Sequence, residues 1–100
     1  EEGRFLMEAM WTRFLPAVAQ AKQWVDDGAI GQVRQVCADF GFRADLEDEH
    51  RLVNPDLAGG SLLDVGVYPI ALSFFMFGGA PLRATGFAEL GRTGVDDQAV

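Results

Sequence analysis

Two polar side chains interrupt the most apolar stretch of the sequence and could together handle a proton. Asp64 and Tyr68 lie within residues 62–77, a run dominated by Leu, Val, Ile and Phe. Residues four apart share one face of a helix, so their β carbons are expected about 5 to 6 Å apart. A carboxylate and a phenol could exchange a proton with a bound molecule, which Gly59 and Gly60 would allow close to the backbone. The spacing fits a structural pair as well, in which Tyr68 packs through its ring and Asp64 caps a turn.

A second pair of side chains could bind a planar ligand. Trp11 and Arg13 flank Thr12, where an apolar run passes into a helical pattern. In open α/β sheets this edge of the sheet is where ligands bind, and an indole offers a flat surface while a guanidinium offers a fork of donors. A packed tryptophan beside an exposed arginine remains the alternative. Glu8, in the same apolar run, needs a partner if it is buried, and Arg51 is a candidate.

The remaining reactive residue types exclude several kinds of site. Cys37 is the one cysteine and His50 the one histidine, so the sequence predicts no internal disulfide and no zinc site. Cys37 has no histidine nearby in sequence, which favours an inert small side chain over a nucleophile. The four carboxylates of residues 45–54 lack the central glycine of a calcium loop.

Length and composition indicate one soluble globular domain. Its 100 residues are 49% hydrophobic, which is enough to build a core. With 15 acidic against 8 basic residues there is no basic stripe, so neither nucleic acid nor an anionic membrane is expected as a partner. The stretch 62–77 carries polar residues and falls short of the roughly 20 needed to span a bilayer, so no transmembrane segment is predicted. The lone cysteine and the absence of a secretory signal pattern favour a cytoplasmic location.

The elements of the first half follow from the spacing of apolar residues. Phe5–Trp11 is a short apolar run typical of a buried strand. Residues 14–27 predict an amphipathic helix, with Pro16 in its first turn and Gly28 just past its end. Alternation over Val36–Arg43 predicts a half-buried strand.

The most apolar element of the chain is predicted to be a long buried helix over residues 62–77, preceded by an exposed polar loop at residues 45–54. Pro69 lacks the amide that would bond to the carbonyl of Val65, so the helix is expected to kink or split just after Tyr68.

Two amphipathic strands, joined by a turn, are predicted to end the sequence. Leu82–Leu90 alternates in polarity, Gly91–Gly94 offers a turn, and Asp96–Val100 begins another strand. Their closeness favours antiparallel pairing. The full order of strand, helix, strand, loop, helix, strand, turn and strand favours an α/β or α+β domain with helices packed on one face of a sheet. The abrupt start at Glu1 and the strand that is only beginning at Val100 suggest a piece of a longer protein.

Three stretches of the sequence are similar to a known family. Residues 5–16 read FLMEAMWTRFLP, residues 50–55 read HRLVNP, and residues 59–69 read GGSLLDVGVYP. Together they resemble the Gfo/Idh/MocA family of nicotinamide-dependent oxidoreductases, and within it the branch of dihydrodiol dehydrogenase and NADP-dependent xylose dehydrogenase. The resemblance covers essentially the whole chain.

The resemblance implies roles for the polar and aromatic residues named above. Tyr68 takes the family's acid/base position, where it would accept a hydroxyl proton while hydride leaves carbon for the nicotinamide of NADP or NAD. A free phenol, with a reference pKa of about 10, is a poor base at neutral pH, but a nearby cation such as the family's catalytic lysine lowers that pKa. Asp64 would orient the substrate or that lysine, and Arg51 would help bind substrate. Trp11 and Arg13 would neighbour the cofactor. The implied substrates are small sugars, polyols or dihydrodiols.

The same resemblance implies a division into domains. Residues 1–30 would be the last strand and crossover helix of a Rossmann domain. Residues 31–100 would be the first part of a C-terminal substrate-binding and oligomerisation domain with an open, mainly antiparallel sheet. The family's glycine-rich phosphate loop and catalytic lysine have no counterpart here, because Lys22, the one lysine, lies on the predicted packing helix. The chain alone is therefore expected to be inactive, and the intact enzyme is expected to form a homo-oligomer through the sheet.

Two other classes of function remain open from the sequence. A ligand-binding or regulatory protein could have the same fold and pocket without turnover, because a fold does not determine a function. A structural assembly domain could pack one face of the sheet on the helices and the other on a second subunit.

Overall fold

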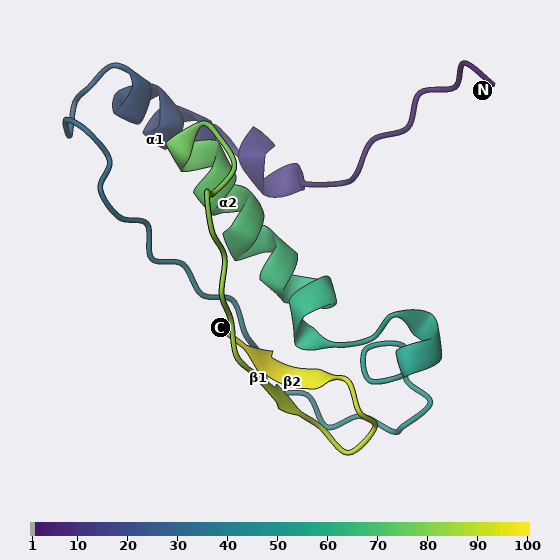
Figure 1. Cartoon of the computed structure of the whole chain (residues 1–100). Coiled ribbons are helices and arrows are strands. Elements are labelled where there is room, and N and C mark those ends of the chain that lie inside the picture. The colour runs from purple at the N-terminus through teal and green to yellow at the C-terminus, as the bar shows by residue number, and fades with distance from the viewer. Residues whose placement is uncertain (1) are drawn as a thin grey trace.

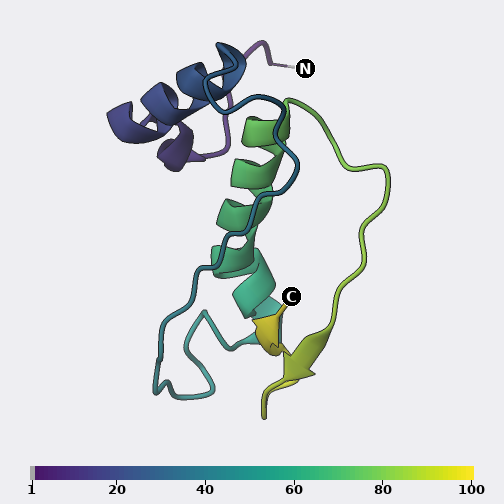
Figure 2. The same cartoon turned by 90° about the vertical axis from the view of Figure 1, so that its left-hand side faces the viewer.

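One long helical stretch organises the other elements of the chain (Figure 1). The computed structural model describes residues 2–100. Its elements, in chain order, are the 3-10 helix η1 (Trp11–Phe14), α1 (Pro16–Asp26), the 3-10 helix η2 (Pro55–Leu57), the π-helical η3 (Leu62–Gly66), α2 (Val67–Phe77), β1 (Ala88–Leu90) and β2 (Asp96–Ala99). Figure 2 shows α1 near the C-terminal end of α2 and the hairpin near the opposite end of the stretch. Helices with one small antiparallel sheet make this an α+β arrangement, as predicted.

The first predicted helix is confirmed as α1. Pro16 is its first residue, where the missing amide costs no hydrogen bond and the fixed φ already suits a helix. Asp27 caps its C-terminal end, and Gly28 follows with φ of +77°, a left-handed conformation that glycine adopts without strain.

The long apolar helix is confirmed, but within the described residues it is not buried as predicted, because few other elements pack against it. Its irregularity also lies elsewhere than predicted. The first turns, η3, are π-helical, and the change to regular α-helix falls between Gly66 and Val67, ahead of Tyr68. Pro69 thus sits in the first turn of α2, where its missing amide needs no partner within that helix. The helix ends at Gly78, which has φ of +74°.

A tight loop leads into this helix and brings two glycines against the chain itself. A β carbon on Gly59 would lie 2.8 Å from the carbonyl oxygen of Leu52, and one on Gly60 would overlap the Asp96 carboxylate. Gly60 also has φ of +118°. The sequence interpretation of these glycines as room for a bound molecule is wrong, because the chain's own atoms fill that space.

The Asp96 carboxylate joins the hairpin to the start of the helical stretch. Its Oδ2 accepts hydrogen bonds from the Ser61 hydroxyl at 2.7 Å and from the Leu62 amide at 2.6 Å. Partial desolvation, the largest single effect, raises the pKa of Asp96, but the hydrogen bonds from Ser61 and from the backbone together lower it below 3.8. The ionised carboxylate thus satisfies an amide at the helix start that has no partner within the helix.

The predicted antiparallel hairpin is confirmed over a shorter length. Ala88 pairs with Ala99 and Glu89 with Gln98, and an irregularity follows between Glu89 and Leu90. The turn is closed by the Gly94 amide, which donates to the Gly91 carbonyl at 3.0 Å.

Three of the predicted strand segments are not strands in the described residues. Phe5–Trp11, Val36–Arg43 and residues 82–87 run without regular pairing, although Phe87 and Val100 exchange two backbone hydrogen bonds. A strand exists only where its amides and carbonyls pair with a neighbour, and apart from this pair at Phe87 the residues 2–100 contain no strand partner for these segments. The helices therefore do not cover a sheet. The predicted loop at residues 45–54 is confirmed, and the Arg92 guanidinium ties it to the hairpin turn through Asp48.

The described residues bury few side chains. Val65 and Val95, which lie where η3 meets the hairpin, are the buried apolar residues. The accessible surface is 8456 Å², whereas a folded monomer of this mass exposes about 5,600 Å². The radius of gyration is 16.5 Å, against about 13 Å for a compact domain of this length. Much of α2 and the extended segments is therefore open to further packing.

The stretch Pro55–Phe77 is long and apolar enough, by length and composition alone, to cross a membrane, which the sequence analysis did not predict. The core helix of a soluble protein has the same length and composition, so this one stretch does not establish a membrane span. Its continuity is broken at Ala58 and Gly60, which both have positive φ, and it carries a carboxylate at Asp64.

The contact between Gly60 and Asp96 predicts that Gly60→Ala destabilises the intact protein. The added β carbon meets the carboxylate, and φ of +118° is strained for any residue with a β carbon. We expect a loss of about 1 to 3 kcal/mol in the free energy of unfolding, measured by urea denaturation. Gly79→Ala is the matched control, because nothing lies within 4 Å of a β carbon there. Equal effects of the two substitutions would contradict this account.

The lowered pKa of Asp96 predicts a pH-dependent contribution to stability. A carboxyl whose pKa is lower in the folded than in the unfolded chain stabilises the fold above about pH 4, and the contribution is lost as pH falls through the folded pKa. The stability difference between wild type and Asp96→Asn should therefore be largest at neutral pH and shrink below pH 4. Urea denaturation across pH 2.5 to 7 measures it, with Asp45→Asn, an exposed carboxyl, as control. A difference that does not change with pH would refute the assignment.

Candidate active site

Three aromatic side chains from distant parts of the sequence meet at the start of α2. The Tyr68 ring lies 6.2 Å from that of Trp11 in an edge-on arrangement, and 5.6 Å from that of Phe40 at a tilt of 56°. Such separations are typical of favourable aromatic pairs. We call Trp11, Phe40 and Tyr68 the aromatic cluster. Phe40 was not singled out from the sequence, although it lies on the apolar face of the alternating segment.

The Tyr68 hydroxyl is available to a bound molecule. Tyr68 is half-buried, and its hydroxyl makes no hydrogen bond within residues 2–100. No buried side-chain oxygen there lacks a partner, so this hydroxyl is open to solvent. A tyrosine with a packed ring and a free hydroxyl is suited to donate or accept a proton at a defined position.

A small cavity of about 200 Å³ borders the aromatic cluster. Its walls are mostly apolar and come from η1, α1, the extended segment and α2: Thr12, Leu15, Val18, Ala38, Asp39, Phe40, Tyr68, Pro69 and Leu72. Ligand pockets usually have about 300 to 1,000 Å³. The described residues thus form one wall of a site rather than an enclosed pocket.

Asp64 and Tyr68 have different neighbours despite their spacing of four. The Arg51 guanidinium pairs with Asp64 Oδ1 at 3.1 Å, and the Arg51 side chain is 68% exposed. Asp64 lies in the π-helical η3, where hydrogen bonds join residues five apart, so the α-helical geometry assumed from the sequence does not hold. Within the described residues no hydrogen bond joins Asp64 to Tyr68. Arg51 pairs with Asp64 and not with Glu8, whose carboxylate accepts from the Ala9 amide.

Trp11 and Arg13 point toward different residues of α2. A 3-10 helix has three residues per turn, so side chains two apart in η1 diverge. Trp11 reaches Tyr68, whereas the Arg13 guanidinium lies 5.3 Å from the centre of the Phe75 ring. The described residues therefore do not bring Trp11 and Arg13 together as the single site for a planar ligand that was predicted.

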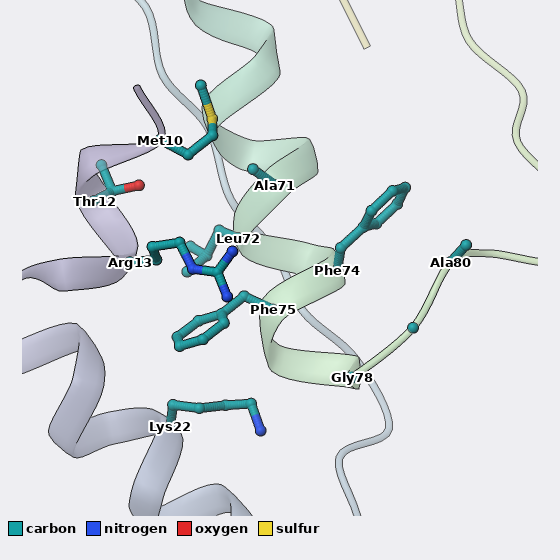
Figure 3. Close-up of a pocket in the computed structure, with 11 residues that line it drawn as sticks. Met10, Thr12, Arg13, Lys22, Ala71, Leu72, Phe74, Phe75, Gly78 and Ala80 are labelled. Carbon is teal, nitrogen blue, oxygen red and sulfur yellow. The ribbon is translucent and has the colours of Figure 1, made fainter. Parts of the chain in front are cut away.

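Arg13 lines a larger cavity of about 510 Å³ at the C-terminal end of α2 (Figure 3). Its lining includes the side chains of Arg13, Lys22 and Phe75 and no carboxylate. The ammonium of Lys22 lies 5.7 Å from the centre of the Phe75 ring and also pairs with Asp26. Phe75 and Lys22 were not predicted as site residues. Phe75 could have been found from the sequence, because it lies seven residues, or two helical turns, after Tyr68. That spacing places Tyr68 and Phe75 on one face of the helix.

Other reactive residues stand apart from these two cavities. Cys37 is exposed, and His50 Nδ1 accepts from the Leu52 amide two residues away. In the part of the chain that the structure describes, no three His, Cys, Asp or Glu residues are grouped to hold a metal ion.

Residues 18–100 match the family model of the GFO/IDH/MocA C-terminal domain. The chain belongs to the GFO/IDH/MocA family. The family resemblance inferred from the three sequence stretches is thereby confirmed.

Individual relatives in the GFO/IDH/MocA family support the predicted branch. D-xylose 1-dehydrogenase (NADP(+)) of Hypocrea jecorina is 45% identical over 78 residues, which are 70% of this chain and 20% of that protein. Trans-1,2-dihydrobenzene-1,2-diol dehydrogenase of Mus musculus is 39% identical over 97 residues, covering 96% of this chain and 28% of that protein. The Danio rerio enzyme of the same name is 42% identical over 99 residues, with the same two coverages. The chain thus spans less than a third of the curated relatives that it matches. No solved structure matches it.

Proposed function

We propose that this chain is part of a dehydrogenase that moves a hydride between NADP or NAD and a hydroxyl-bearing carbon of a sugar, polyol or dihydrodiol. The observation that carries the proposal is the free Tyr68 hydroxyl on a fixed aromatic ring beside a cavity. The relatives named xylose and dihydrodiol dehydrogenase support the same reaction class. NADP is favoured over NAD because the xylose enzyme's name specifies it.

In this proposal Tyr68 exchanges the proton of the reacting hydroxyl. As an alcohol is oxidised, its O–H proton would pass to the Tyr68 oxygen, which has to be in the phenolate form to accept it, while the carbon–hydrogen bond breaks with its electron pair. A bound nicotinamide would supply the acceptor for that hydride. Trp11 and Phe40 hold the Tyr68 ring in its orientation and provide one apolar wall beside the reacting carbon.

Asp64 and Arg51 are proposed to orient the substrate's other hydroxyls. Their ion pair is 3.1 Å long, and the Arg51 side chain is 68% exposed while that of Asp64 is 23% exposed. Solvent screens the pair from the arginine side, and both groups retain hydrogen-bonding capacity toward a ligand. A carboxylate and a guanidinium side by side suit the alternating donors and acceptors of a vicinal diol.

Arg13 and Trp11 are proposed as neighbours of the cofactor. The cavity that Arg13 lines has positive side chains and no carboxylate, which suits an electron-rich or anionic part of a nicotinamide nucleotide. The sequence has no glycine-rich loop for the pyrophosphate, so these residues fit one end of the cofactor only. We therefore propose that the chain alone is inactive.

We also propose the division of residues 1–30 as the end of a Rossmann domain and residues 31–100 as the start of the substrate domain. The unpaired apolar run Phe5–Trp11 supports it, since that run lacks strand partners among residues 2–100. A cytoplasmic location and a homo-oligomer formed through the sheet belong to the same proposal. Phe87, beside β1, is 78% exposed, which supports a further packing partner on this hairpin.

Tyr68→Phe in the intact protein tests the proposed function. The substitution keeps the ring in the aromatic cluster and removes a hydroxyl without a protein partner, so the melting temperature should stay near that of wild type. We expect kcat to fall roughly 10² to 10⁴-fold with a smaller change in KM, measured by absorbance of the reduced nicotinamide with aldoses, polyols and dihydrodiols.

Ser73→Ala is the matched control for that experiment. It removes a hydroxyl from the same helix, where Ser73 donates to the Pro69 carbonyl at 2.9 Å. It should cost about 0.5 to 1.5 kcal/mol of stability and leave kcat unchanged. A Tyr68→Phe enzyme with kcat within a few-fold of wild type would reject the catalytic assignment. Ligand binding without turnover in wild type would favour a binding or regulatory protein on this fold.

A further inference from the structure

One aromatic ring on α2 is held between two cations from two other elements. Figure 3 shows Phe75 with Arg13 of η1 on one side and Lys22 of α1 on the other. The guanidinium carbon of Arg13 lies 5.3 Å and the Lys22 ammonium 5.7 Å from the ring centre. Both distances are within the range of an attractive cation–π interaction. We call Arg13, Lys22 and Phe75 the clamp.

The clamp fixes η1, which carries Trp11, against α2, which carries Tyr68. Trp11 and Arg13 belong to the same single turn, and Tyr68 and Phe75 belong to the same helix. Trp11 contacts Tyr68 while Arg13 contacts Phe75, so η1 touches α2 at two points. Two contacts determine where a short element lies, whereas one leaves it free to pivot.

Each cation of the clamp is held from its own side. The Lys22 side chain is only 17% exposed and pairs with Asp26 one turn along α1. The guanidinium of Arg13 also lies 5.7 Å from the ring of its neighbour Phe14. Both cations therefore keep a defined position over Phe75, and the partial burial of Lys22 strengthens its attraction to the ring.

We infer that Phe75 is a positioning residue for the substrate wall, acting through Arg13 on Trp11. Phe75 itself lies away from Tyr68 and touches no reacting atom. Loosening the clamp lets η1 move and displaces the indole from the edge of the Tyr68 ring, which weakens substrate binding without removing the Tyr68 hydroxyl. This inference rests on the proposed dehydrogenase function.

Phe75→Leu in the intact protein tests the inference. Leucine keeps an apolar side chain but removes the face that both cations contact. A contact between Trp11 and the hydroxyl substrate stabilises the ground state and the transition state equally. The KM for that substrate, measured at saturating cofactor, should therefore rise about 5- to 30-fold while kcat changes less than 3-fold. Phe75→Tyr, which retains an aromatic face, should keep KM within 2-fold of wild type.

Phe77→Leu is the matched control. Phe77 is a phenylalanine of the same helix, but it lines neither cavity and no cation lies over its ring in the described residues. It should leave KM unchanged. A similar rise in KM for Phe77→Leu and Phe75→Leu, or no rise for Phe75→Leu, would overturn the inference. A fall in kcat at unchanged KM would also overturn it, because that is the result of losing folded enzyme.

A second measurement separates failure of this inference from failure of the proposed function. In a double-mutant cycle of Phe75→Leu with Trp11→Leu, measured by urea denaturation, the unfolding constants should be non-additive by more than about 3-fold if the clamp positions Trp11. Additive effects would overturn the inference. If wild type shows no turnover, the proposed function fails. The double-mutant cycle then decides by itself whether Phe75 positions Trp11. If Phe75→Leu does not fold, Lys22→Met removes one cation in its place and should raise KM in the same direction.

Discussion

The hydrogen bonds of the Asp96 carboxylate are the contact on which the rest of this structure depends. They join β2 to the start of the helical stretch, 34 and 35 residues earlier in the chain. The contact requires a residue without a β carbon at Gly60 and places the buried Val65 and Val95 at the same junction. Once the helix start is fixed there, the positions of Tyr68 and Phe75 along the axis of α2 are fixed as well. Residues of α2 line both cavities, so the helix also positions the cavities.

The clamp and the aromatic cluster show how a protein with little core can still order a site. Val65 and Val95 are far from sufficient to hold η1 and α1 in place. Those two elements are instead fixed by ring contacts and cations along one helix. Such contacts contribute only about 0.5 to 2 kcal/mol each, so the geometry is more sensitive to single substitutions than that of a site built on a large core.

Local signals predicted the helices and the turn, and failed where a distant partner was needed. Pro16, Gly28 and Gly78 define helix ends by their own backbone preferences, so α1 and the end of α2 followed from the sequence. Apolar and polar residues alternate over Val36–Arg43 as they do in a strand. This alternation indicates which side chains share a face, but it does not show that another strand is available for pairing. The π turn was not predicted from the sequence, so the α-helical spacing assumed for Asp64 and Tyr68 does not apply at Asp64. Tyr68 and Trp11 were singled out from the sequence in two separate pairs, and their contact was not predicted. Phe40 and Phe75 were hidden among eight phenylalanines.

The π turn also constrains how the length of this helix can change. A π turn contains about one residue more than an α turn, and each residue of an α-helix rotates the chain by about 100°. Deleting one residue from Leu62–Gly66 would therefore convert this turn into a regular α turn and leave the later helix in the same rotational phase relative to the Asp96 contact. A deletion between Tyr68 and Phe75 has no such turn to absorb it, and it would rotate Phe75 by about 100° relative to Tyr68. The helix can thus lose one residue in η3 and keep both contacts with η1, whereas it cannot lose one in this part of α2.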